Sequence, residues 1–152
     1  MVTSEPACGR QAVPKPREPL KNNKYKHMKS DIQNREDILF IMTAFYVKLL
    51  EDNLVKHFFE DIIQQNHLEE HLETITDFWN GILFNDTAYQ KNAMQPHLIL
   101  NETKPFMKIH FKTWLHHFTT TIDENFSGDK ADMAKTRALS IATVMEIKMI
   151  NS

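Results

Sequence analysis

From residue 31 onward, hydrophobic residues recur at three- and four-residue spacing, the period of an α-helix with one buried face. In residues 37–52, Ile38, Ile41, Phe45 and Leu49 all fall on the same face. The pattern predicts helices over residues 37–52, 54–60, 67–84, 105–126 and 129–150, with a short helix in the broken stretch 85–104. No stretch shows the strict alternation of a half-buried strand. We therefore predict an all-α fold.

Two sequence signals predict where the last two long helices begin. Pro105 is expected to open the helix over 105–126, because proline is favoured at the first helical position. In Ser127-Gly128-Asp129, glycine is expected to end one helix and Asp129 to cap the next.

The first 29 residues differ from the rest of the chain. They hold four of the six prolines and seven Lys or Arg against two Glu, and they contain few large apolar residues. Such a segment cannot bury enough apolar surface to offset the entropy of ordering. We predict a disordered basic extension over residues 1–30 and a single domain over residues 31–152.

Composition excludes several classes of function. The net charge of −2 argues against broad nucleic-acid binding, and no apolar stretch approaches the roughly 18 residues of a membrane span. A single cysteine, Cys8, allows neither an intrachain disulfide nor a thiolate zinc site. The three glycines form no Gly-rich phosphate loop. We expect a cytoplasmic protein with no nucleic-acid or membrane partner.

One short motif indicates zinc chemistry. His67-Leu68-Glu69-Glu70-His71 matches H-x-x-E-H, an inverted zinc-protease signature, and its two histidines share a helix face. The pattern has only three fixed letters, and catalysis would need a third ligand. A zinc hydrolase using His67 and His71 is therefore an alternative of lower rank.

A second set of residues is distinctive in its order and spacing along the chain. The set runs His71, Ile75, Phe78-Trp79 and Gly81, then Tyr89, then His97-Leu98, then His110-Phe111, and finally Trp114-Leu115. Over about residues 35–150 this arrangement resembles the truncated haemoglobins, and specifically their third group, because the Gly-Gly loop motifs of the other two groups are absent. The resemblance implies a 2-on-2 helical sandwich, in which helices 37–52 and 67–84 form one antiparallel pair and helices 105–126 and 129–150 form the other.

The resemblance also implies one haem b and a role for each site residue. His97 would be the proximal ligand of the iron, Tyr46 the distal tyrosine that donates to bound dioxygen, and His71 the distal histidine. Trp114 would close the distal pocket. Further haem-pocket contacts would come from Phe59, Ile75, Phe78 and Phe111.

The segment before His97 departs from the family pattern. Relatives often read Y-x-G-x-P, whereas this chain reads Tyr89-Gln90-Lys91-Asn92-Ala93, and Pro96 directly precedes His97. Proline disfavours helix at Gln95, so the local geometry is not predicted. The candidate partners of a haem propionate are Lys91, Lys104 and Lys108.

A globin of this kind would bind dioxygen, nitric oxide or carbon monoxide, and a polar pocket would slow dioxygen release. The sequence leaves open whether it is a carrier, a sensor or an enzyme such as a nitric-oxide dioxygenase or peroxidase supplied by a reductase. It also leaves the oligomeric state open. The other alternative is a haem-free, all-helical interaction module, which would show the same apolar periodicity.

Overall fold

The structure is a computed structural model that describes residues 28–150, so residues 1–27 of the expected basic extension lie outside the described part. The helical elements are α1 (Arg35–Glu51), η1 (Lys56–Phe59), α2 (Glu60–Gln64), α3 (Leu68–Phe84), α4 (Met94–Thr103), α5 (Lys108–Asn125) and α6 (Asp129–Ile150). The described residues contain no strand. The predicted all-α class is confirmed, and the long predicted helices are present. The helix predicted over residues 54–60 is instead the 3-10 helix η1 followed by the short helix α2.

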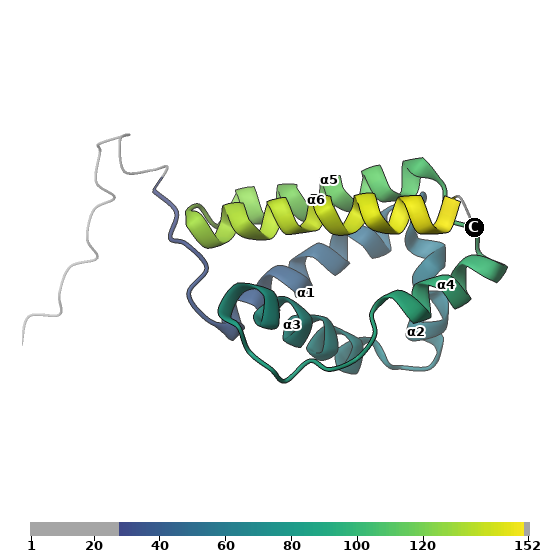
Figure 1. Ribbon diagram of the computed structural model, residues 1–152, viewed down its shortest axis with the longest axis horizontal. Coiled ribbons are helices and arrows are strands. Elements are labelled where there is room, and N and C mark those ends of the chain that lie inside the picture. The colour runs from purple at the N-terminus through teal and green to yellow at the C-terminus, as the bar shows by residue number, and fades with distance from the viewer. Residues whose placement is uncertain (1–27, 151–152) are drawn as a thin grey trace, which may run out of the picture.

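The long helices form two antiparallel pairs in two layers. Arg35, at the start of α1, bonds Glu73 and Asp77 of α3 at 2.6 and 2.9 Å. Tyr46, near the end of α1, meets His71 at the start of α3, so the two helices run in opposite directions. The α5–α6 pair lies side by side over the α1–α3 pair (Figure 1). This is the 2-on-2 sandwich that the sequence resemblance implied.

The start of α6 differs from the prediction, because Asp31 and not Asp129 supplies the cap. The Asp31 carboxylate accepts hydrogen bonds from the backbone N–H groups of Lys130 and Ala131, at 2.8 and 2.9 Å. Gly128 has φ +144°, and a Cβ at this position would lie 2.5 Å from the Asp31 side chain. Asp31 therefore fastens the segment before α1 to the turn between α5 and α6.

The expectation that Pro105 opens the next helix is wrong, because α5 begins at Lys108. The Asn101 side chain accepts the backbone N–H of Phe106 at 2.8 Å, and His110 Nδ1 accepts that of Met107 at 2.9 Å. These bonds hold residues 106 and 107 in a connection before the helix.

Pro96, in contrast, is accommodated within α4, and Gln95 is helical although the proline after it disfavours helix there. Pro96 lies in the first turn, where a backbone N–H would have no intrahelical partner. The Asn92 side chain accepts the N–H of Met94 at 3.0 Å and so closes the start of the helix.

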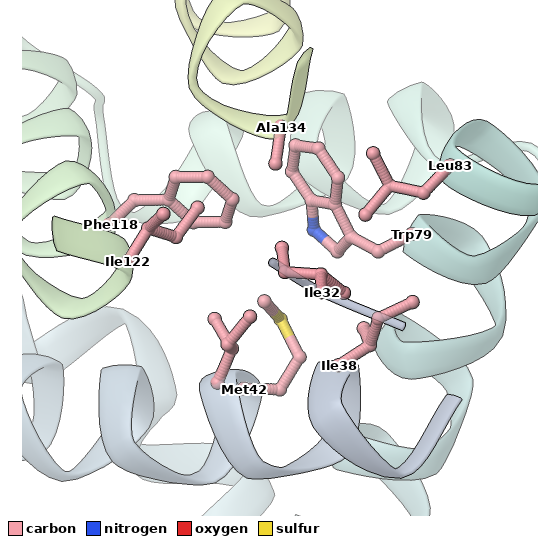
Figure 2. A pocket seen from close by; sticks show the side chains of 9 residues that line it. Ile32, Ile38, Met42, Trp79, Leu83, Phe118, Ile122 and Ala134 are labelled. Carbon is pink, nitrogen blue, oxygen red and sulfur yellow. The ribbon is translucent and has the colours of Figure 1, made fainter. Parts of the chain in front are cut away.

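One end of the sandwich is packed solidly. Figure 2 shows the side chains of this end pointing toward one another from α1, α3, α5 and α6. The residues are Ile32, Ile38, Ile41, Met42, Trp79, Leu83, Phe118, Ile122 and Ala134. They leave a void of only about 10 Å³, roughly the space of one water molecule. This end anchors the four long helices to each other.

Candidate functional site

The other end of the same helices encloses a cavity of about 540 Å³. Its size falls within the range of roughly 300–1,000 Å³ that is usual for ligand sites. All eight residues that the resemblance placed at the site line this cavity: Tyr46, Phe59, His71, Ile75, Phe78, His97, Phe111 and Trp114. Five of the helical elements contribute them, so residues far apart in sequence meet at one place.

His97 lies on α4 with a defined ring orientation. Its Nδ1 lies 2.7 Å from the carbonyl oxygen of Ala93. A carbonyl can only accept, so Nδ1 carries the hydrogen, and Nε2 of the neutral ring keeps its lone pair. Within residues 28–150, Nε2 has no hydrogen-bond partner. An imidazole held in this way by a backbone carbonyl is ready to bind a metal through Nε2.

Tyr46 and His71 form a polar pair within the aromatic surroundings. Tyr46 Oη lies 2.7 Å from His71 Nε2, and Tyr46 is only 4% exposed. Burial raises the pKa of the Tyr46 phenol, which therefore stays neutral at physiological pH. Burial, and secondarily the charge of His97, lowers the pKa of His71. The two neutral groups can exchange donor and acceptor roles according to the tautomer of His71.

Aromatic rings connect the cavity wall to the solid core. Trp114 stacks on Phe118 with ring centroids 5.5 Å apart, and Trp79 stacks on Phe118 at 4.7 Å. Phe118 is 1% exposed and belongs to the solid end. Trp79 borders both the solid end and the cavity, whereas Trp114 borders the cavity but not the solid end. The core therefore fixes the position of the Trp114 side of the cavity.

Sequence reasoning missed a second group of lining residues around the start of α5. Phe58 and Phe106 stack at 4.3 Å, and His110 packs edge-on against Phe58 at 4.9 Å. His110 Nδ1 accepts a backbone N–H, so its neutral ring carries the hydrogen on Nε2. Burial, followed by the charge of His57, lowers the pKa of His110 and favours that neutral form. The cavity wall thus contains a further N–H donor.

A zinc site formed by His67 and His71 would need a third ligand, and the described residues supply none. In the described part of the chain, no three or more His, Cys, Asp or Glu side chains gather as a metal site would require. His71 Nε2 is already engaged by Tyr46.

As for a membrane, none of the helices described here is both long and apolar enough to cross one.

Comparison with known proteins finds similarity to truncated haemoglobins of the third group. No family model matches the chain. The sequence is 29% identical over 118 residues to the group 3 truncated haemoglobin ctb of Campylobacter jejuni, an alignment that covers 76% of this chain and 91% of that protein. The crystal structure of the group III truncated haemoglobin from Campylobacter jejuni matches with a TM-score of 0.72 and 27% identity, over 80% of this chain and 95% of that chain. In sequence and in fold, this chain is therefore similar to the group III truncated haemoglobins.

Proposed function

We propose that the protein binds one haem b in the 540 Å³ cavity, with His97 Nε2 as the iron ligand, and that it binds dioxygen or another diatomic gas reversibly. The observation that carries the proposal is the free lone pair of His97 beside an aromatic cavity that also contains the Tyr46–His71 pair. The similarity to a group III truncated haemoglobin, in sequence and in fold, supports it.

The residues that line the cavity fit this cofactor. A porphyrin presents two apolar faces, and the lining is dominated by aliphatic and aromatic side chains. The buried polar groups are few, and each has a role that haem chemistry can use. A bound haem would supply an iron centre that takes up dioxygen, nitric oxide or carbon monoxide.

On the proximal side, Ala93 positions His97. Its carbonyl accepts the Nδ1 hydrogen, which fixes the tautomer and limits rotation of the ring. The same bond makes Nε2 more basic and therefore a stronger ligand. Because Ala93 directly precedes α4, the helix start and the ligand are set by the same few residues.

On the distal side, Tyr46 and His71 would bind the gas. When His71 Nε2 carries a hydrogen and donates to Tyr46 Oη, the phenol O–H is free to donate to a diatomic ligand. Dioxygen held in this pocket would carry partial negative charge, so the bond from the Tyr46 phenol would slow its release. Trp114, on the same cavity wall as Phe111, offers an indole N–H as a second donor.

Slow release is suited to chemistry on dioxygen or nitric oxide, with electrons supplied by a reductase, and less to transport. Nitric-oxide dioxygenation, peroxidase-like activity and sensing can all use the same pocket residues. The residues described here favour none of these over the others.

The test is absorption spectroscopy of the full-length protein, purified with added hemin, in its ferric, ferrous and carbonyl forms. We expect a one-to-one complex, and a ferrous form that takes up carbon monoxide with a shift of its main absorption band. A colourless protein that leaves hemin unbound would overturn the proposal and support the haem-free interaction module.

A further inference from the structure

Helix α4, which carries His97, is held in the fold differently from the long helices. None of its residues is buried, whereas α1, α3, α5 and α6 each contribute buried side chains. The α4 residues Pro96, His97 and Leu100 line the cavity instead. Core packing therefore restrains α4 less than it restrains the long helices.

The side chain of Asn101 joins the last part of α4 to two other segments. Its Nδ2 donates to the carbonyl of Met149, in the last turn of α6, at 3.2 Å. Its Oδ1 accepts the backbone N–H of Phe106, in the α4–α5 connection, at 2.8 Å. One amide thus uses both its donor and its acceptor to hold α4 near the C-terminal end of α6 (Figure 1).

Lys104, the residue directly after α4, supplies a second anchor. Its ammonium donates to the carbonyl of His57 in η1 at 2.8 Å and to the carboxylate of Glu60 in α2 at 3.3 Å. The Lys104 side chain is 24% exposed and that of Glu60 is 55% exposed, so solvent screens the ion pair. Of the two bonds, the one to the His57 carbonyl is therefore the firmer.

The iron ligand of the proposed function and the two anchors lie on one face of α4. His97, Asn101 and Lys104 are four and three residues apart, so they follow one another at successive helical turns. Asn92 and Ala93 also bond residues of α4, but they adjoin the helix and move with it. Asn101 and Lys104 bond atoms of other elements, and so they restrain the helix as a whole.

We propose that Asn101 and Lys104 are positioning residues for the iron ligand, because by fixing α4 they keep His97 Nε2 where it binds the iron. The proposal rests on the proposed function. Neither Asn101 nor Lys104 lines the cavity, so each would act through His97 and not on the cofactor itself. A ligand that is held in place beforehand binds more strongly than one that must be ordered on binding. Loss of an anchor should therefore weaken the bond between His97 and the iron.

The first experiment measures the rate of haem loss from the full-length protein to an excess of a haem-scavenging globin. Asn101→Leu removes both bonds of the amide at similar size, and Lys104→Met removes the ammonium. Thr103→Val is the matched control, because Thr103 is exposed and bonds the carbonyl of Leu100 within α4. We expect Asn101→Leu to lose haem about three- to tenfold faster than the parent and Lys104→Met about two- to threefold faster. Thr103→Val should match the parent.

The same substitutions are then made in His97→Ala supplied with free imidazole, in which the iron ligand is no longer attached to α4. We expect Asn101→Leu and Lys104→Met to leave haem loss unchanged in this background. The same acceleration in both backgrounds would overturn the proposal, because the anchors would then act on the cavity and not through His97. Parent-like rates for both variants when His97 is present would also overturn it.

A further readout needs no cofactor. In the haem-free protein, hydrogen exchange of the amides of residues 94–103 should be faster in Asn101→Leu and in Lys104→Met than in the parent, and exchange in α1 should be unchanged. Unchanged exchange in α4 would overturn the proposal, since an anchor that does not restrain the helix cannot position His97. If Asn101→Leu does not fold, Lys104→Met decides each comparison. Failure of the parent to bind haem would instead refute the proposed function, so the two failures are distinguishable.

Discussion

The two ends of the molecule are built from the same four helices, yet one is solid and the other hollow. On α1, Ile38 and Met42 belong to the solid end, whereas Tyr46, one turn later, lines the cavity. On α5, Phe118 is at the solid end and Trp114, one turn earlier, is at the cavity. Each long helix thus changes role partway along its length, from scaffold to binding wall.

The side chains explain the difference. At the solid end, α6 presents the small buried residues Ala131, Ala134 and Ala138, which let its neighbours approach closely. At the hollow end, bulky rings pack in pairs against each other, such as Phe58 with Phe106, and do not fill the centre. Stability should therefore reside mainly in the solid end, and ligand chemistry in the hollow one.

The largest expected effect on stability is from Phe118→Ala. Phe118 is 1% exposed, and its removal leaves a cavity that costs about 3–5 kcal/mol of the free energy of unfolding. The matched variant is Phe78→Ala, whose ring is only partly buried at the cavity wall. Urea unfolding of the haem-free protein should show a clearly smaller loss for Phe78→Ala. Equal losses would contradict the division into scaffold and binding wall.

A change confined to the hollow end should affect ligand kinetics more than folding. Tyr46→Phe removes a donor to bound dioxygen, and hydrogen bonds to charged groups contribute about 1.5–3 kcal/mol. Dioxygen release, followed by stopped flow, should therefore be roughly 10- to 100-fold faster, since about 1.4 kcal/mol corresponds to a factor of ten. An unchanged release rate would remove Tyr46 from the ligand-binding account.

A smaller effect is expected at the clamp between the segment before α1 and α6. Asp31→Asn weakens a helix-capping interaction that is usually worth about 0.5–2 kcal/mol. Burial by itself would raise the pKa of Asp31, but hydrogen bonds from the backbone of Lys130, Ala131 and Ile32 outweigh it, and the net pKa is lowered.

The pH dependence of this clamp follows from the sign of that shift. Because the folded-state pKa is lowered, the Asp31 contribution is present above the unfolded value of about 3.9 and is lost as the pH falls through the folded-state pKa. The difference in stability between the parent and Asp31→Asn should be full at pH 7 and shrink below about pH 4. A difference that is the same at pH 7 and in acid would show that the carboxylate charge is not involved.

Local patterns predicted the helices well because each long helix buries one face. They failed where a helix end depends on a distant side chain. Asp31 caps a helix about a hundred residues later, and Asn101 holds the segment that Pro105 was expected to start as helix. The capping preference of Asp129 and the helix-start preference of Pro105 are local properties, so they do not show that Asp31 or Asn101 lies nearby in the fold.

The site shows a similar limit. Through the family resemblance, order and spacing along the chain identified eight of the residues that line the cavity. They missed His110, Phe106 and the α6 residues Ile141 and Met145, which also line it. Periodicity identifies which face of a helix is buried but does not say whether that face meets another side chain or a void.

The central claim is that His97 Nε2 binds the iron of a haem in the hollow end. The most direct measurement is the absorption spectrum of the ferrous His97→Ala variant, recorded without and with added imidazole. We predict that the variant loses the five-coordinate ferrous spectrum of the parent and that imidazole, which can occupy the vacated space, restores it. A variant that keeps the parent spectrum without imidazole would contradict the account.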